Sequence, residues 1–588
     1  MSRTIVHVLL ENARQYPDRI IIKHKSEKGG PFVDLTWSEL HERVTALCAG
    51  LIDKGLKPGD RVALLSYNRL DWILADLAVL MAGGIDVPIY HTNTAEQCQY
   101  IIQDAGCKFV VAEDQTQCAK IASLDVTPIM IEAGNGAERI SSIMERGRRV
   151  RDRLAGDMAD RLEQIQPDAM ATIVYTSGTT GPPKGCMISH GNTTYVLESI
   201  DRLIQIDPDS NLSLLVLPLS HFYPRVSGYY YNLYKNVPLA MAESIDTLSQ
   251  DMQAIRPTFF CSVPRILEKV HARIVAGAHQ GSALQAKLFD WAVQKGRIRG
   301  QALLAGKTLS AGQTMAYKLA DRLVLSRIRE RLGGRLRFAV SAGAPLSAEV
   351  GEFVHSLGVQ VLEFYGLTET LGGTMTTFEK CRYGTVGMAM PGFEVSLAED
   401  GEILIRGNNF MGYFNRPDLT AEAVKEDGWC YTGDVGQWDD DGFLKITDRK
   451  KDLIITSGGK NISPQNLENI LKTLPLIANA MVFGDRRKYL TALITLEPED
   501  TENWARSRNI QYNNFAELSQ NKELREYLTE RIEEMNQGLA RFETIKRFAV
   551  LERDFSQEHG EITPTLKVRR KVVTETYRHL LEAMYDGE

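Results

Sequence analysis

Two spacings of apolar residues recur along most of the chain. Residues 37–54 place apolar side chains three and four positions apart, which predicts an amphipathic helix, whereas residues 61–65 form a short apolar run that predicts a buried strand. Similar runs predict further strands at 171–175, 213–217, 258–263, 336–341 and 359–364. Because helices and strands alternate, we predict an α/β fold up to about residue 450.

The character of the sequence changes near residue 450. The charged run Arg-Lys-Lys-Asp at 449–452 precedes a predicted strand at 453–456 and a Gly-Gly pair. Two more apolar runs, at 480–484 and 489–496, and a charged helix at 521–537 predict a second, smaller unit of helices and strands. No low-complexity linker separates the two patterns. We therefore predict two domains, 1–450 and 451–588, joined by a short hinge.

Composition narrows the class of protein. Hydrophobic residues make up 44% of the 588 positions and charged residues 24%, as in ordinary globular proteins. The net charge of −7 argues against a general nucleic-acid-binding protein, so we expect no nucleic-acid partner. The eight cysteines form no C-x-x-C pair, which favours reduced thiols in a cytoplasmic protein over a zinc site or a disulfide framework.

The chain shows no pattern of a membrane span or of a signal peptide. Its most apolar window, 72–90, carries Asp76 and Asp86, so we interpret it as a buried helix and strand. The apolar residues 5–10 are followed at once by Glu11 and soon by Arg14, which a signal peptide would not contain there.

The most informative stretch follows the predicted strand at 171–175. Residues 176–185 read Thr-Ser-Gly-Thr-Thr-Gly-Pro-Pro-Lys-Gly. Glycines let backbone N–H groups approach an anion closely, hydroxyls add donors, and a lysine supplies a mobile positive charge. The stretch lacks the spacing of a Walker A loop, yet its chemistry predicts a loop that holds a polyphosphate. Its candidate ligands are Thr176, Ser177, Gly178, Thr179, Thr180, Gly181 and Lys184.

This stretch resembles the phosphate loop of the adenylate-forming enzymes, which include acyl-CoA synthetases, peptide-synthetase adenylation domains and firefly-type luciferases. Further segments in the family's order extend the resemblance over nearly the whole chain. It implies an α/β fold with a large, multi-subdomain N-terminal adenylating domain and a small, mobile α+β C-terminal domain. It also implies ATP and Mg²⁺ as cofactors, and a fatty acid and CoA as the other reactants.

Two segments resemble the family's adenine site. Gly343, Ala344 and Pro345 lie in the run Ser-Ala-Gly-Ala-Pro-Leu at 341–346, which resembles the adenine-binding loop. A strand-to-helix turn is an equally good interpretation of that run, and both can hold together. Tyr365, which follows a predicted strand, would stack on adenine.

Tyr365 opens a second strong match, Tyr-Gly-Leu-Thr-Glu-Thr. The resemblance places Gly366 beside the nucleotide, Thr368 on a phosphate, and Glu369 with Thr176 on Mg²⁺. Mg²⁺ commonly takes few carboxylates together with phosphate oxygens, which agrees with a single glutamate. Taken alone, a Thr-Glu pair would more often cap a helix.

Three later segments resemble parts of the site near the predicted hinge. Asp434, in Tyr-Thr-Gly-Asp, resembles the residue that binds both ribose hydroxyls, although an aspartate in a turn is the simpler alternative. Arg449 would face the nucleotide, and Lys451 would be the pivot of the small domain. Gly458 would line the pantetheine tunnel after that domain rotates.

Two more residues complete the set that the resemblance makes catalytic. His221, after Leu-Pro-Leu-Ser, resembles the histidine that lines the acyl-carboxylate pocket. Lys567 resembles the lysine required for adenylation. Many relatives have glycine directly before that lysine, whereas this chain has Leu566, as the long-chain fatty acid branch does. Lys567, Glu369, Thr176, Lys184 and His221 would together position the reactants and neutralise their charge.

The segments at 256–265 and 333–338 also resemble long-chain acyl-CoA synthetases. We therefore expect a ligase that activates a medium- or long-chain fatty acid as acyl-AMP and transfers it to CoA. Transfer to a carrier protein and a nucleotide-binding pseudoenzyme remain as alternatives, and peripheral membrane association and homodimer formation are left open.

Two features of the sequence allow two interpretations each. The aromatic residues Phe222, Tyr223, Tyr229 and Tyr230 follow His221, and they line an acyl tunnel or simply fill the core. The helix-rich, basic segment 284–332 is a solvated insertion or a docking surface.

Overall fold

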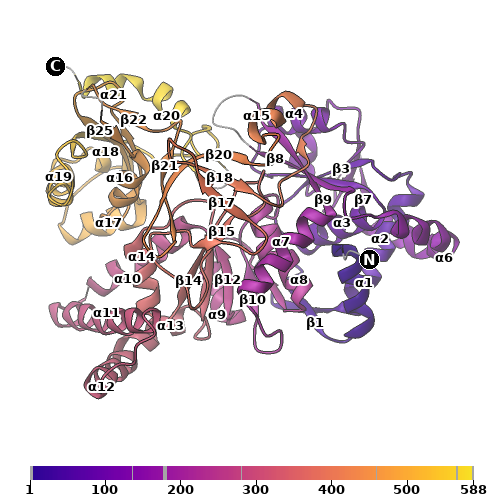
Figure 1. The fold of residues 1–588 in the computed structure, drawn as a ribbon, viewed down its shortest axis with the longest axis horizontal. Helices are drawn as coiled ribbons and strands as arrows, with labels where there is room; N and C mark the ends of the chain where they lie inside the picture. Colours follow the sequence, from indigo (N-terminus) through magenta and orange to yellow (C-terminus); the bar gives the residue numbers. More distant parts are fainter. Residues whose placement is uncertain are drawn as a thin grey trace.

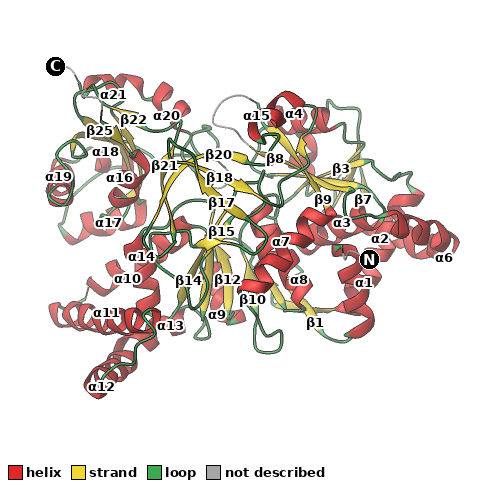
Figure 2. Cartoon of the chain, viewed as in Figure 1, coloured by secondary structure: helices red, strands yellow, loops and turns green. Residues whose placement is uncertain are grey.

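The computed structural model describes residues 4–134, 137–176, 182–279, 281–457, 460–563 and 567–585. In Figure 1 the residues after about 450, in orange to yellow, form a separate body at the upper left of the larger N-terminal body. Figure 2 shows strands inside the large body and helices around it.

The first sheet of the large body has eight strands in the order β19-β9-β8-β4-β3-β5-β6-β7. Strands β8 to β7 run parallel, while β9 pairs antiparallel with β8 and with β19. Their bounds are β3 (Arg61–Leu65), β4 (Ile85–Ile89), β5 (Phe109–Ala112), β6 (Thr127–Met130), β7 (Glu138–Arg139), β8 (Met170–Thr176), β9 (Lys184–Ser189) and β19 (Gly412–Tyr413). The associated helices are α2 (Trp37–Asp53), α3 (Leu70–Met81), α4 (Ala95–Ala105), α5 (Gln115–Ala119) and α6 (Ile140–Gln164).

The start of α2 and its contact with α6 both follow from local sequence. The Thr36 hydroxyl accepts a hydrogen bond from the backbone N–H of Glu39, and the Glu39 carboxylate accepts one from the backbone N–H of Thr36, which forms a capping box. Gly147 of α6 lies so close to α2 that a Cβ there would be 1.8 Å from the carbonyl oxygen of Ala46. Glycine is therefore needed where these two helices cross.

The second sheet has nine strands in the order β16-β15-β14-β13-β12-β10-β11-β1-β2. The six strands from β14 to β1 run parallel, and the edge strands are antiparallel. The bounds are β1 (Ile20–Lys25), β2 (Phe32–Thr36), β10 (Ser213–Leu215), β11 (Leu239–Met241), β12 (Phe259–Ser262), β13 (Phe338–Ala342), β14 (Gln360–Tyr365), β15 (Thr374–Met375) and β16 (Met388–Ala389). The loops after β10, β13 and β14 leave the same edge, where open α/β sheets bind ligands.

Helices surround this second sheet, and two short segments are π-helical. The elements are α1 (Ile5–Gln15), α7 (His190–Leu203), η1 (Pro224–Tyr230), α8 (Tyr231–Lys235), α9 (Leu248–Ile255), α10 (Pro264–His279), α11 (Ala283–Leu304), α12 (Ala311–Ala320), η2 (Asp321–Leu325), α13 (Ser326–Arg331) and α14 (Ala348–Ser356). The segment interpreted as helix-rich at 284–332 is thus helical over most of its length.

A third, antiparallel sheet joins the large body to the small one. It contains β17 (Glu394–Leu397), β18 (Glu402–Arg406), β20 (Cys430–Trp438) and β21 (Leu444–Arg449), with α15 (Pro417–Ala423) between β18 and β20. The sequence did not predict these strands. Bulges interrupt the register of β18 with β20 and of β20 with β21. In β20 the alternating buried positions include Thr432, Asp434 and Gly436, so no apolar alternation marks the strand.

The C-terminal body is built on a short two-stranded and a three-stranded sheet. Its strands are β22 (Ile454–Ile455), β23 (Asn461–Ile462), β24 (Ile477–Phe483), β25 (Leu490–Leu496) and β26 (Ile545–Val550). Its helices are α16 (Pro464–Leu471), α17 (Pro498–Ser507), α18 (Phe515–Ser519), α19 (Lys522–Asn536), α20 (Arg570–Thr576) and α21 (Arg578–Ala583). Strand β25 alternates between two cores, with Ala492 and Ile494 in one and Leu493 in the other, so it is buried on both faces.

The elements predicted from apolar spacing are confirmed with small shifts at their ends. The predicted helix at 37–54 is α2, the run at 61–65 is β3, and the window 72–90 contains α3 and β4. All eight cysteines are free thiols, and seven of them are buried. Among the described residues, no helix is both long and apolar enough to cross a membrane.

Ion pairs connect α10 of the large body to the C-terminal body. The carboxylate of Glu497 lies 3.9 Å from Arg265 and 3.6 Å from Lys269. One turn further along α10, Arg273 lies 3.5 Å from Glu499, and Glu268 pairs with Lys472 at 3.5 Å. These contacts hold the two bodies in the orientation seen here.

Candidate functional site

The predicted phosphate loop connects β8 to β9. Thr176 ends β8 and is paired with Lys184, which begins β9, so the two ends of the loop lie side by side. Residues 177–181 lie outside the described residues. The Lys184 amine lies 5.1 Å from the centroid of the Tyr413 ring, a cation–π distance.

Tyr413 connects this loop to Glu369. Its hydroxyl donates a hydrogen bond of 2.6 Å to Oε1 of Glu369. Tyr413 lies in β19, which pairs with β9 directly after the loop. Sequence reasoning missed Tyr413, because a single tyrosine in a two-residue strand forms no pattern.

Glu369 lies in a turn and caps no helix. The chain passes from β14 to β15 through a fully described stretch without a helix, so the helix-cap alternative is wrong. Thr370 closes the turn by accepting a hydrogen bond of 3.0 Å from the backbone of Leu367. A Cβ at Gly366 would lie 2.8 Å from Gly372, so glycine is needed for the close approach of the turn's two ends. Thr368 is half-buried in the same turn.

Asp434 receives hydrogen bonds from two partners. The Tyr365 hydroxyl donates to its Oδ2 at 2.9 Å, and Nε of Arg449 donates to its Oδ1 at 2.8 Å. Asp434 lies within β20, opposite Arg449 of β21, so the interpretation as a turn aspartate is wrong. Asp434 raises the pKa of Arg449, while burial and the Asp434 charge raise that of Tyr365. Both partners stay protonated, and each carboxylate oxygen keeps a lone pair for another donor.

His221 has a defined tautomer. The backbone N–H of Tyr223 donates to its Nδ1 at 3.1 Å, so the ring proton sits on Nε2. Burial, with the positive charge of Lys567, lowers the pKa of His221 to about 4. At neutral pH the ring is therefore uncharged and offers a single N–H donor.

Lys567 brings the C-terminal body to this site. Burial and then the charge of Arg449 lower the pKa of Lys567 to about 8, against an opposing effect of Asp434. Residue 567 is exposed overall, although enough protein lies around its amine for burial to lower the pKa. Lys567 is therefore close enough to His221, Arg449 and Asp434 to interact with them electrostatically.

The predicted adenine loop is also a strand-to-helix turn. It connects β13 to α14, and Gly343 adopts a φ of +87°, which favours glycine. Gly343 is exposed, and Ala344 and Pro345 are half-buried. Below them the carboxylate of Glu363 accepts a hydrogen bond of 3.4 Å from the backbone of Leu346. Burial raises the pKa of Glu363 to about 8.

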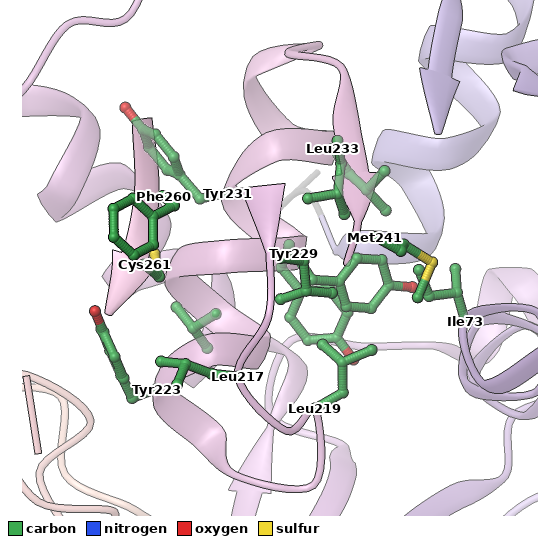
Figure 3. Packing of buried hydrophobic residues seen from close by; sticks show 14 of the residues in the cluster. Ile73, Leu217, Leu219, Tyr223, Tyr229, Tyr231, Leu233, Met241, Phe260 and Cys261 are labelled. Carbon is green, nitrogen blue, oxygen red and sulfur yellow. The ribbon is translucent and has the colours of Figure 1, made fainter. Parts of the chain in front are cut away.

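The aromatic residues after His221 lie in the core. Figure 3 shows Tyr223 and Tyr229 among buried residues such as Leu217 and Met241. The Tyr223 hydroxyl donates to the carbonyl oxygen of Val340 at 2.8 Å, which ties the His221 segment to β13. The core interpretation of these aromatics therefore holds.

A buried ionic cluster supports the same segment, and sequence reasoning missed it. Arg225 of η1 donates to Asp86 at 2.7 Å and to the Tyr230 hydroxyl at 3.0 Å, and that hydroxyl donates to Asp76. The two carboxylates are fully buried, and burial raises the pKa of both. Asp76 and Asp86 had argued only against a membrane span, but they fix the π-helix that follows His221.

The hinge candidates divide between described and undescribed residues. Lys451 is exposed in a turn between β21 and β22, whereas Gly458 lies outside the described residues. Hydrogen bonds, a cation–π contact and charge interactions connect the described site residues in two groups. The residues are Lys184, Glu369, Tyr365, Asp434, Arg449, His221 and Lys567. One group lies at the two ends of the predicted phosphate loop, and the other lies around Asp434.

Relatives are similar in sequence to this chain over almost its full length. Residues 9–414 match the AMP-binding enzyme family, and residues 451–588 match the AMP-binding enzyme C-terminal domain. A long-chain-fatty-acid–CoA ligase of Mycobacterium bovis is 35% identical, over 99% of this chain and 97% of its own length. One from Homo sapiens is 31% identical, over 100% of this chain and 86% of its own.

Solved structures share the fold. The adenylation domain of a carboxylate reductase from Mycobacterium chelonae has a TM-score of 0.77 at 24% identity, covering 99% of this chain and 91% of that one. The anthranilate CoA ligase AuaEII, in complex with anthranoyl-AMP, has a TM-score of 0.73 at 16% identity, covering 99% and 98%. With the family match over most of the sequence, these findings show that the chain belongs to the AMP-binding enzyme family.

Proposed function

We propose that this enzyme activates a medium- or long-chain fatty acid in two steps. The acid's carboxylate attacks the α-phosphorus of ATP, which gives acyl-AMP and releases pyrophosphate. The thiol of CoA then attacks the acyl carbonyl, the carbonyl–phosphate bond breaks, and AMP leaves. The observation that carries this proposal is Lys567, which interacts with both His221 and the Asp434–Arg449 pair although it comes from the other body. The names of the relatives support a fatty acid and CoA as reactants.

The first step needs positioning and charge neutralisation more than acid–base catalysis. His221 would donate its Nε2 proton in a hydrogen bond to the substrate carboxylate. Asp434 would accept hydrogen bonds from the ribose hydroxyls while Tyr365 and Arg449 hold it in place. Lys567 would place its ammonium where the carboxylate and the α-phosphate meet. Lys184 would place its ammonium beside the outer phosphates and neutralise part of their charge.

The donor set fits a magnesium ion that is shared with ATP. Glu369 offers one carboxylate, held by Tyr413, and Thr176 offers a hydroxyl at the start of the phosphate loop. No group of three or more His, Cys, Asp or Glu side chains among the described residues is arranged to hold a metal. Phosphate oxygens would therefore supply the other ligands, as Mg²⁺ prefers. When bound, the ion would neutralise the phosphate charge.

The second step would require rotation of the small domain. We place the boundary between domains 1–450 and 451–588, because the first core includes Leu444 and the second begins at Ile454. Rotation about Lys451 would withdraw Lys567 and bring the Gly458 turn to the pantetheine of CoA. The present orientation, in which Lys567 interacts electrostatically with His221 and Asp434, would correspond to adenylation. We further propose that the enzyme acts in the cytoplasm and contacts membranes peripherally, as a monomer or a homodimer.

Pyrophosphate release with a panel of acids, with and without CoA, tests this proposal. We expect turnover with medium- or long-chain acids, and acyl-CoA formation only when CoA is present. Accumulation of acyl-AMP that CoA does not consume would support delivery to a carrier protein. No release with any acid would support the pseudoenzyme, which the retained Glu369, Asp434, Arg449 and Lys567 argue against.

Glu369→Gln should raise the Mg²⁺ concentration needed for half-maximal adenylation by about tenfold or more, because one anionic ligand is lost. The measurement is a magnesium titration of pyrophosphate release, with circular dichroism to check the fold. Glu349→Gln, at an exposed position of α14, is the matched control and should leave the titration unchanged. An unchanged titration for Glu369→Gln itself would remove this residue from the metal site.

Glu497→Lys should slow adenylation about two- to fivefold without slowing CoA transfer. The change replaces attraction to Arg265 and Lys269 by repulsion, a loss of about 1 kcal/mol for the orientation seen here. Single-turnover assays of each half-reaction provide the measurement, and 0.5 M salt should narrow the difference from the wild type. Glu533→Lys on α19 is the charge-matched control. Equal slowing of both half-reactions would show that these ion pairs do not select an orientation.

A further inference from the structure

The helices α11 and α12 expose an unusual set of apolar side chains. Figure 1 shows both helices projecting from the lower left of the large body, away from the sheets. Every exposed leucine among the described residues lies on this projection or on the adjoining η2: Leu284, Leu288, Leu303, Leu319 and Leu323. Met315 of α12 is exposed by 73%. Single exposed leucines are common on proteins, but such a concentration on one segment is a feature that needs an explanation.

Three of these side chains form one row. Met315, Leu319 and Leu323 are spaced four residues apart along α12 and η2, so they lie on one face of a continuous helical segment. Lys318 and Arg322 form a second exposed row directly beside it. The docking face is defined here as these five residues. The docking face therefore exposes an apolar row and a basic row side by side, and its apolar row does not pack into the core.

The segment that carries the docking face is strongly basic. Residues 283–331 contain ten lysines and arginines and only three acidic residues, whereas the whole chain has a net charge of −7. One of the three, Asp321, is paired with Arg329 at 2.6 Å, and another, Asp290, with His279 at 3.1 Å. The two basic residues of the docking face therefore meet little neutralising charge from their own segment.

We propose that the docking face binds the surface of an anionic lipid bilayer. Methionine and leucine side chains would enter the region between headgroups and acyl chains, while Lys318 and Arg322 pair with phosphate groups. Charge complementarity selects this occupant: a basic face on an acidic protein matches a negatively charged surface. The purpose of this membrane binding rests on the proposed function, because long-chain acids partition into bilayers and the enzyme would collect its substrate there. The binding itself requires no catalysis.

Co-sedimentation of the full-length protein with lipid vesicles tests this proposal. We expect binding to vesicles of phosphatidylcholine and phosphatidylglycerol in a 3:1 ratio at 0.1 M salt, and much weaker binding to pure phosphatidylcholine or at 0.5 M salt. Lys318→Glu/Arg322→Glu and Leu319→Gln/Leu323→Gln should each reduce the partition coefficient by about tenfold or more. Matched controls are Arg486→Glu/Lys488→Glu, in an exposed turn of the C-terminal body, and Ile245→Gln. Both should bind like the wild type.

Three outcomes would overturn the proposal. The first is no binding to anionic vesicles, and the second is binding that neither double variant weakens. The third is self-association: the molecular mass in solution rises with protein concentration, and Leu319→Gln/Leu323→Gln lowers it to the monomer value. The docking face would then join two copies of the chain. Pyrophosphate release by the same variants with a water-soluble medium-chain acid should match the wild type. Loss of turnover by the wild type would count against the proposed function alone, since the vesicle assay contains neither ATP nor acid.

Discussion

Lys567→Ala should slow acyl-AMP formation by about two or more decades, the usual effect of losing one preorganised charge contact with a transition state. Thioester formation from supplied acyl-AMP should stay close to the wild-type rate. In the present orientation Lys567 is close enough to the Asp434–Arg449 pair and His221 to interact with them electrostatically, and rotation of the small domain would remove it. Single-turnover assays of the two half-reactions measure both rates.

The pKa of Lys567 adds a second expectation for the same residue. Adenylation needs the ammonium form, which predominates below the pKa of about 8, is nearly complete well below it, and is lost as the pH rises through it. The kcat/KM for adenylation should therefore fall above pH about 8, because this parameter reports the free enzyme. Lys567→Arg keeps its charge to well above that pH, so any activity it retains should lack this fall.

Lys571→Ala provides the matched control, since it removes an exposed lysine of α20 close by in the chain. It should leave both half-reactions and the pH profile unchanged. Equal loss of both half-reactions in Lys567→Ala would contradict the assignment. A fall above pH 8 that persists in Lys567→Arg would assign the titration to another group.

The parts of the fold that could be predicted from sequence are those with continuous burial. Strands β3, β12 and β13 are buried along most or all of their length, so their apolar runs are unbroken and easily recognised. Strand β20 is different: every second residue from Cys430 to Gly436 is buried, but Thr432, Asp434 and Gly436 at those positions are not apolar. Bulges also shift its pairing with β18 and β21. Its strand character comes from neighbours far along the chain, and no local pattern reveals it.

The site shows the same division between local and distant information. Individual residues such as Glu369 and Asp434 could be predicted because they occur in contiguous motifs. The partner of Glu369 could not, since Tyr413 meets it only through tertiary packing, and the same holds for the pairing of Arg225 with Asp86. The hydrogen bond from Tyr413 to Glu369 joins a strand of the first sheet to the turn that follows β14 of the second. Sequence therefore predicted which chemistry is present, and the structure added how its groups are held.

Lys451→Pro should separate the two half-reactions. The substitution fixes φ near −65° and removes one backbone N–H at the proposed pivot. In the present orientation the Arg449 carbonyl accepts from the N–H groups of Asp452 and Leu453, at 2.9 and 3.1 Å, so neither bond uses the N–H of residue 451. The adenylating orientation should therefore tolerate proline, and acyl-AMP should form at a rate close to that of the wild type.

Transfer to CoA should fall by at least about tenfold in the same variant, which corresponds to roughly 1.4 kcal/mol or more in activation free energy. This step needs a different orientation of the small domain, and a residue that cannot change its φ opposes the rotation that reaches it. Lys451→Ala is the matched control: it removes the same side chain but leaves φ free, so both steps should proceed nearly normally. The measurement is a pair of single-turnover assays, one for each half-reaction, with circular dichroism as the check on folding. If a folded Lys451→Pro variant slows both steps equally, or slows neither, rotation about this residue is not how the enzyme changes from adenylation to thioester formation.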